Sequence, residues 1–143
     1  MHIMNTKNTI RKEILKARGT LSSEEVQEKS SIIINKLIKT KEFENSKLIM
    51  CYMDFRNEVR TDELIRKCLE MGKKVAVPLV LNSAEGEREM MACEVRDFEK
   101  EMKPGAYGIL EPVRELVCDV WPEDIDLVVV PGVAFDERKY RIG

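Results

Sequence analysis

The sequence contains little histidine and no closely spaced pair of cysteines. Its single histidine is His2, and its four cysteines, Cys51, Cys68, Cys93 and Cys118, lie far apart without a C-x-x-C motif. The scarcity of histidine excludes most catalysis that depends on an imidazole group. Since each cysteine stands among apolar neighbours and free cysteine is commonly buried, we expect four reduced residues in the protein core.

Long apolar runs and an excess of one charge are also missing. No run approaches the roughly 20 apolar residues of a membrane span, and the N-terminus lacks the hydrophobic stretch of a signal peptide. The 24 Lys and Arg residues nearly balance the 26 Asp and Glu residues, with both signs interspersed. We therefore expect a cytoplasmic protein with no membrane and no nucleic-acid partner.

Chain length and apolar content set the expected size of the fold. The 143 residues correspond to one domain of ordinary size, and a hydrophobic fraction of 43% is sufficient for one core. The sequence shows no internal repeat, low-complexity tract or long linker. We therefore expect residues 1–143 to form a single domain.

Two helices are expected in the first part of the chain. Residues 6–18 carry apolar side chains at helical spacing and stop before Gly19. Residues 22–40 begin with Ser22 three positions before Glu25, which is the spacing of a capping box. The box predicts a well-defined start for the second helix.

Short apolar runs follow and predict strands, because they are too short for free-standing helices. A third helix fits between the first two runs, with Thr61 as its cap and Gly72 at its end. Strands alternating with crossover helices indicate an α/β fold, with a three-layer, mostly parallel sheet and helices on both faces. The four expected strands are residues 48–53, 75–81, 90–95 and 125–130.

The loop after Met53 is a candidate ligand site, because open α/β sheets bind ligands beyond the carboxyl ends of their strands. In this loop Glu58 stands close to hydrophobic Met53 and Phe55. One interpretation is that Glu58 accepts hydrogen bonds from the ring N–H and amino groups of a flat heterocycle. The alternative is that its carboxylate complements the N-terminus of the following helix.

The loop after the last strand, residues 131–136, is followed by a concentration of positive charge. Its proline and glycine end the strand, and Asp136 can turn the chain through its side chain. The charge favours phosphate binding, with a solvated basic tail as the alternative. Three cations fall within four residues, ahead of a final glycine: Arg138, Lys139 and Arg141.

Two further stretches offer groups for a ligand. Lys7 and Arg11 are four residues apart and share one face of the first helix, where surface solubility is the alternative explanation. Tyr107 lies in the flexible stretch 105–108 and can either stack on a ligand or pack in a turn. Trp121 is expected to anchor the strand that follows it.

Four short motifs stand in order along the chain. They are Lys7-Asn8-Thr9-Ile10-Arg11, Asn57-Glu58-Val59-Arg60-Thr61, Tyr107-Gly108-Ile109-Leu110-Glu111-Pro112, and residues 131–136. In order and spacing they resemble the motifs of the 5-formyltetrahydrofolate cyclo-ligases, also called methenyltetrahydrofolate synthetases. The resemblance extends over nearly the whole chain.

The resemblance implies conversion of 5-formyltetrahydrofolate to 5,10-methenyltetrahydrofolate with ATP and Mg²⁺, on a fold related to sugar-phosphate isomerases and CoA transferases. The implied reaction needs positioning and charge stabilisation more than a protein nucleophile, so no catalytic residue is assigned. The implied ATP-binding residues are Lys7, Arg11, Arg141, Ile142 and Gly143. The implied folate-binding residues are Met53, Phe55, Glu58 and Tyr107.

The family pattern continues past Gly143 with a glycine-rich stretch, a further strand and a further helix. Those segments supply most of the phosphate cradle and an aspartate for Mg²⁺, so no metal ligand is implied within this sequence. The resemblance thus implies a C-terminally truncated domain, a monomer or weak homodimer, with impaired turnover and with apolar faces and sheet edges uncovered.

Two other functions stay open at this point. One is a non-catalytic folate-binding or interaction module that has lost its nucleotide loop. The other is a relative that acts on sugar phosphates or CoA thioesters, with Glu58 as its acidic nucleophile or base.

Overall fold

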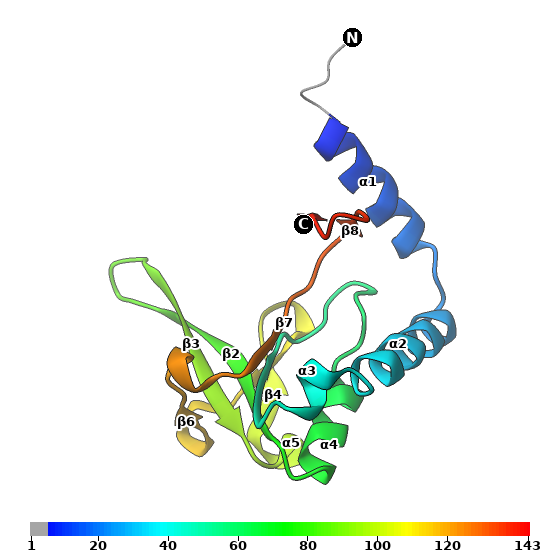
Figure 1. Cartoon of the computed structure of the whole chain (residues 1–143). Helices are drawn as coiled ribbons and strands as arrows, with labels where there is room; N and C mark the ends of the chain where they lie inside the picture. The colour runs from blue at the N-terminus through cyan, green and yellow to red at the C-terminus, as the bar shows by residue number, and fades with distance from the viewer. Residues whose placement is uncertain (1–5) are drawn as a thin grey trace.

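A five-stranded sheet forms the centre of the computed structural model, which describes residues 6–143 (Figure 1). His2 therefore lies outside the described residues. The strand order is β6-β3-β2-β1-β7. The strands are β1 (Leu48–Cys51), β2 (Lys74–Asn82), β3 (Arg88–Val95), β6 (Cys118–Asp119) and β7 (Leu127–Val129).

The expected α/β class is confirmed, and the parallel part of the sheet comprises β2, β1 and β7. Strand β3 runs antiparallel to β2, and β6 runs antiparallel to β3. The reason is the connection between β2 and β3, a tight turn in which Ser83 donates its N–H to Glu87 O at 2.8 Å. A turn this short forms a hairpin, whereas a parallel pair needs a crossover of a dozen or more residues.

The helices begin and end largely where local sequence signals place them. The capping box is confirmed: Glu25 N donates to Ser22 Oγ, and Ser22 N donates to Glu25 Oε1, both at 3.1 Å. The second helix ends earlier than expected, because Thr40 caps a separate short helix by accepting Phe43 N. The helices are α1 (Thr6–Gly19), α2 (Ser23–Leu37), α3 (Lys41–Glu44), α4 (Asp62–Glu70) and α5 (Phe98–Glu101).

Thr61 precedes α4 as expected but makes no side-chain cap, so that prediction is wrong. Its hydroxyl lies 2.8 Å from Tyr52 O and 3.2 Å from Asp54 Oδ1, and its N–H donates to the same Asp54 oxygen. Thr61 is almost fully buried, so the hydroxyl satisfies groups of the strand-end loop in place of the helix.

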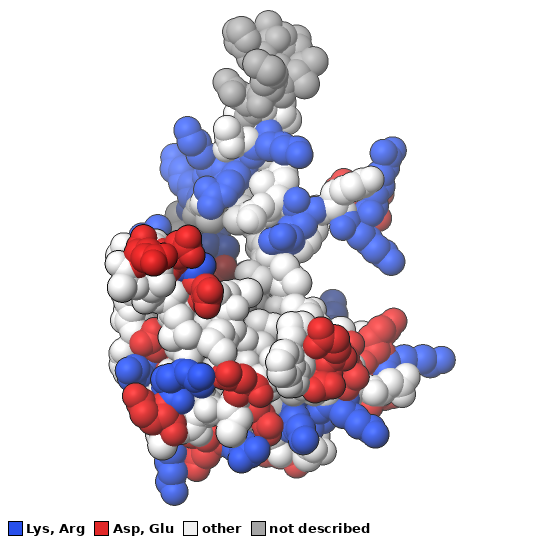
Figure 2. Space-filling model, turned by 90° about the vertical axis from the view of Figure 1, so that its left-hand side faces the viewer, with Lys and Arg blue, Asp and Glu red and all other residues white. Residues whose placement is uncertain are grey.

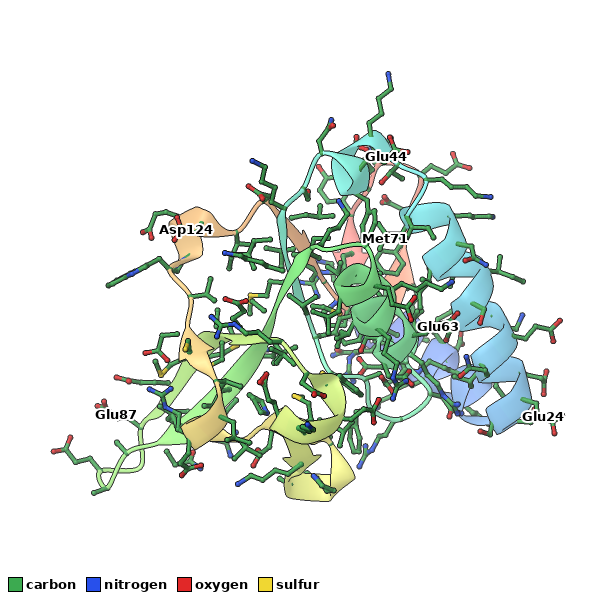
Figure 3. The ribbon with its side chains drawn as sticks, turned by 90° about the horizontal axis from the view of Figure 1, so that it is seen from below. Glu24, Glu44, Glu63, Met71, Glu87 and Asp124 are labelled. Carbon is green, nitrogen blue, oxygen red and sulfur yellow. The ribbon has the colours of Figure 1, made fainter. Side chains whose placement is uncertain are left out.

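The core lies between the sheet and the layer of α2, α3 and α4 (Figure 1). Strand residues on this face pack against residues of the three helices, among them Ile34, Phe43 and Ile65. Helix α4 is also tied to α2 by polar contacts, because Glu63 Oε2 accepts Ser31 Oγ at 3.0 Å. In Figure 3, Glu63 points toward α2. The buried strand residues are Ile49, Cys51, Val75, Val77, Leu79, Cys93 and Val95.

The opposite face of the sheet carries exposed apolar side chains. Val80, Met90, Val128 and Val130 are each at least half exposed. The expectation of helices on both faces is therefore met on one face only within residues 6–143.

The remaining elements are short and lie around the sheet. A hairpin of β4 (Met102–Pro104) and β5 (Leu110–Pro112) encloses η2 (Ala106–Gly108). A second hairpin of β8 (Ala134–Phe135) and β9 (Arg141–Ile142) lies beside α1 at the top of Figure 1. Two more short helices are η3 (Arg114–Leu116) and η4 (Pro122–Asp124).

Two sequence expectations about single residues are corrected. Cys51, Cys68 and Cys93 are free thiols in the core, but Cys118 is exposed, because it lies in the edge strand β6 opposite Glu94. Trp121 is 74% exposed and does not anchor β7, since it stands ahead of η4 at the surface. Across residues 6–143, every helix is too short or too polar to cross a membrane.

Candidate functional site

The loop between β1 and α4 has an unusual backbone that its side chains hold in place. Arg56 and Asn57 have positive φ angles of 49° and 61°, a left-handed conformation that asparagine often adopts and arginine rarely does. Asn57 Nδ2 donates to Arg18 O at 2.9 Å and to Leu21 O at 3.2 Å. These bonds fix the loop against the end of α1 and turn neighbouring side chains into a shared space.

Glu58 lies in this loop with one carboxylate oxygen already bound. Phe55 N donates to Glu58 Oε1 at 2.8 Å, so the carboxylate orders its own loop, and no bond to the α4 N-terminus is formed. No hydrogen bond to Glu58 Oε2 is formed by the described residues, which leaves it able to accept from a ligand. Glu58 is half-buried, and its role toward a heterocycle stays a prediction.

Tyr52 forms a hydrogen bond to the backbone of the same loop. Its hydroxyl donates to Val59 O at 2.8 Å. Burial raises the pKa of Tyr52 far above its usual range, and the nearby Glu58 carboxylate adds to the effect. Tyr52 therefore stays a neutral donor that braces the loop.

A cavity of about 270 Å³ lies between α1, this loop and the C-terminal segment. It brings Arg11, Arg141 and Gly143, implied for ATP, together with Phe55 and Glu58, implied for folate. Figure 2 shows that Lys and Arg predominate over the upper part of the molecule, whereas basic and acidic residues are interspersed over the lower part. The other lining residues are Leu15, Arg18, Arg56, Pro131, Gly132 and Val133.

Lys7 and Ile142 line a neighbouring cavity of about 470 Å³ and do not reach the first one. Arg141 lines both cavities, so they adjoin at its side chain. Lys7 and Arg11 share a helix face as expected, but the structure places them on two sides of Arg141. Arg141 itself is held by a bond from its Nη1 to Pro131 O at 2.8 Å.

The C-terminal hairpin turns through Asp136, as the sequence predicts. Asp136 Oδ1 accepts the N–H groups of Arg138 and Tyr140, both at 2.9 Å. Gly143 has a φ of 131°, and a Cβ atom there would lie 2.7 Å from Val133 N. The close approach of these two backbone segments requires glycine at this position.

A third cavity, of about 420 Å³, receives the other implied folate residues. Met53 and Tyr107 both line it, together with apolar residues of β2 and with Arg88. The rings of Phe55 and Tyr107 lie 6.1 Å apart at 43° and join this cavity to the arginine-lined one. Tyr107 is 84% exposed, so it does not pack in its turn, and its ring is free to stack on a ligand.

A fourth cleft, of about 830 Å³, is larger than the three cavities above and lies at the amino ends of the parallel strands. Glu44, Met71 and Asp124 surround it in Figure 3, which views the molecule from below. None of the motif residues lines this cleft. Ligands of α/β sheets bind at the carboxyl ends of strands, so we place the site at the smaller cavities.

Metal ligands are sparse in the described part of the chain. Residues 6–143 contain no group of three or more His, Cys, Asp or Glu side chains that could hold a metal ion. Glu58 is the one carboxylate that lines the arginine-lined cavity. These residues do not by themselves fit a Mg²⁺ site.

Two arginines of the site were missed in the sequence. Arg18 follows Arg11 by seven residues, a spacing that keeps both on one face of α1 and could have revealed it. Arg56 carried no such signal, because only the left-handed backbone of the loop directs its side chain to the cavity.

Comparison with known proteins shows relatives that match nearly the whole chain. The chain is 29% identical over 143 residues to a probable 5-formyltetrahydrofolate cyclo-ligase of Caenorhabditis elegans, covering 99% of this chain and 69% of that protein. A probable 5-formyltetrahydrofolate cyclo-ligase of Schizosaccharomyces pombe is 30% identical, and the match covers 96% of this chain and 66% of that protein.

Solved structures give the same result. The NMR structure of Aquifex aeolicus 5,10-methenyltetrahydrofolate synthetase matches with a TM-score of 0.77 and 36% identity, over 96% of this chain and 66% of that one. The chain thus spans about two thirds of the length of these relatives. Residues 3–143 match the 5-formyltetrahydrofolate cyclo-ligase family, and the chain belongs to that family.

Proposed function

We propose that this chain carries the folate site and part of the nucleotide site of an ATP-dependent cyclo-ligase that makes 5,10-methenyltetrahydrofolate from 5-formyltetrahydrofolate. The observation that carries the proposal is the arginine-lined cavity. Arg11 from one end of the chain and Arg141 from the other meet there beside Glu58. Residues for two substrates thus line one space, as a reaction between those substrates requires.

The proposed reaction balances with ATP as the phosphoryl donor. The formyl oxygen bonds to the γ-phosphorus as the bond to ADP breaks. The neighbouring folate nitrogen then attacks the formyl carbon, phosphate leaves with the proton of that nitrogen, and the ring closes. Guanidinium groups suit this chemistry, because they bind phosphoryl oxygens and neutralise their charge.

The folate ring is proposed to lie between the arginine-lined cavity and the Met53 cavity. Glu58 Oε2 would accept hydrogen bonds from adjacent ring N–H and amino groups, while Phe55 and Tyr107 offer apolar faces for stacking. We propose that Mg²⁺ accompanies the nucleotide and that the protein acts in the cytoplasm.

Turnover of the purified chain tests the proposal. With 5-formyltetrahydrofolate, ATP and Mg²⁺, we expect an absorbance increase from the methenyl product. Arg11→Gln should lower kcat/KM by about 10- to 100-fold, because a cation beside the phosphates is lost. Lys12→Gln is the matched control, since Lys12 lies on the same helix and lines neither cavity.

Equal activities of the Arg11 and Lys12 variants would contradict the role of the arginine-lined cavity. Absence of product together with saturable binding of 5-formyltetrahydrofolate would favour the alternative, a folate-binding module without catalysis. That alternative is supported by the separate cavity of Met53 and Tyr107, which contains no implied nucleotide residue.

A further inference from the structure

Arg56 occupies a special place in the candidate site. Its Cζ atom lies 4.8 Å from the centroid of the Phe55 ring, and its side chain lines the same cavity as Glu58, Arg11 and Arg141. It therefore stands where residues implied for folate meet residues implied for the nucleotide.

The charges around this cavity do not balance. Four guanidinium side chains line it against one carboxylate side chain, that of Glu58, so the lining side chains alone carry 4 − 1 = 3 net positive charges. None of the four forms an ion pair with a carboxylate of residues 6–143. Like charges held in one space repel each other, and an anionic ligand removes that repulsion.

The cations come from separate walls of the cavity. Arg11, Leu15 and Arg18 lie along one face of α1, so the two arginines are about 10 Å apart along the helix axis. Arg56 faces them from the loop that Asn57 fastens to Arg18 O. This separation is between backbone positions, and a chain of phosphates offers oxygens to several guanidinium groups at once.

The backbone conformation at Arg56 is one that disfavours arginine. Its φ of 49° is a conformation that glycine adopts without steric cost and that arginine does not. An arginine at this position therefore carries a local cost, which is consistent with a role for the guanidinium group.

We propose that Arg56, assisted by Arg18, binds the phosphoryl group while it passes from the nucleotide to the formyl oxygen. This inference rests on the proposed function and adds two residues to the site. Arg11 and Arg141 hold the nucleotide phosphates on one side, and Arg56 reaches the transferred group from the folate side. Its contact with Phe55 orients the guanidinium group over the folate pocket.

Three variants at position 56 separate charge from packing. Arg56→Gln and Arg56→Gly should lower kcat about 100-fold and leave the KM for 5-formyltetrahydrofolate within about twofold. Arg56→Lys should recover part of the rate, because it restores a positive charge. Arg56→Gly should also raise the thermal unfolding midpoint or leave it unchanged, since glycine fits the left-handed backbone.

The matched control is Arg96→Gln, which removes an exposed guanidinium group that lines none of the three cavities. It should keep the wild-type kcat. A purely structural role for Arg56 would lower the unfolding midpoint of Arg56→Gln. That result, or a kcat within about threefold of wild type, would overturn the inference.

Calorimetry with inorganic tripolyphosphate gives a readout that does not depend on turnover. Wild-type protein should bind tripolyphosphate, and Arg56→Gln should bind it at least about tenfold more weakly. Arg96→Gln should bind it as wild type does. Absence of wild-type binding, or equal binding by Arg56→Gln, would overturn the inference. If Arg56→Gln weakens tripolyphosphate binding but wild type neither binds nor converts 5-formyltetrahydrofolate, the proposed function alone fails.

Discussion

The four cysteines show how strongly the environment of a single residue determines its chemistry. Burial raises the pKa of Cys51 to about 12 and that of Cys68 to about 11. Burial also raises the pKa of Cys93. A thiol reacts as its thiolate, so these three side chains are protected both by packing and by protonation. Cys118 has neither the packing nor the burial.

We therefore expect one fast-reacting thiol in the folded protein. Ellman's reagent at pH 8 should modify one thiol per chain quickly, and all four after unfolding in guanidinium chloride. Cys118→Ser should remove the fast phase, while Cys68→Ser should leave it unchanged. Rapid modification of two or more thiols in the folded protein would contradict the buried positions of the other three.

At the scale of elements, Asp126 joins the neighbouring parallel strands β1 and β7 at their amino ends. Its Oδ2 accepts Lys47 N at 2.8 Å and Leu48 N at 2.9 Å, directly ahead of β7. These bonds, chiefly that from Leu48 N–H, lower the pKa of Asp126. A carboxylate with a lowered folded-state pKa stabilises the fold above its unfolded pKa, and loses that effect as pH falls through the folded pKa.

Asp126→Asn should consequently lower the urea midpoint of unfolding at pH 7, because the charge that holds the two N–H groups is removed. The difference from wild type should shrink as the pH falls below about 4, where the wild-type carboxylate becomes protonated. Asp124→Asn, in the exposed η4, is the control and should follow wild type at both pH values. A difference that stays constant down to low pH would contradict this account of Asp126.

Local elements could be predicted well from the sequence, and elements set by distant contacts could not. The Ser22–Glu25 capping box and the Asp136 turn depend on neighbours within four residues, and both were found. Thr61 was misread because its hydroxyl is used by Tyr52 O, nine residues away. The β2–β3 hairpin was missed because both strands read as buried runs, and only their short connection fixes their direction.

At the scale of the whole molecule, the site depends on bringing the two ends of the chain together. The motifs identified Arg11, Glu58 and Arg141, but their meeting in one cavity follows from α1 packing beside the C-terminal hairpin (Figure 1). No periodicity in the sequence predicts that packing. The oligomeric state, a monomer or weak homodimer, stays a prediction. The relation of the fold to sugar-phosphate isomerases also stays a prediction.

Glu58 is the residue on which the folate assignment depends most. It accepts Phe55 N with one oxygen and keeps the other for a ligand, and it adjoins the aromatic pair of Phe55 and Tyr107. Glu58→Gln keeps an acceptor for the loop bond and removes the charge, so it tests ligand binding without removing that bond. Glu87→Gln, in the exposed hairpin turn labelled in Figure 3, is the matched control.

The most direct measurement is calorimetric titration of the chain with 5-formyltetrahydrofolate in the absence of ATP. Wild type and Glu87→Gln should show the same saturable binding. Glu58→Gln should bind at least about tenfold more weakly, a loss of about 1.4 kcal/mol, because charged acceptors form the stronger hydrogen bonds. Saturable binding that is unchanged in Glu58→Gln, or no binding by wild type, would contradict the assignment of this site to folate.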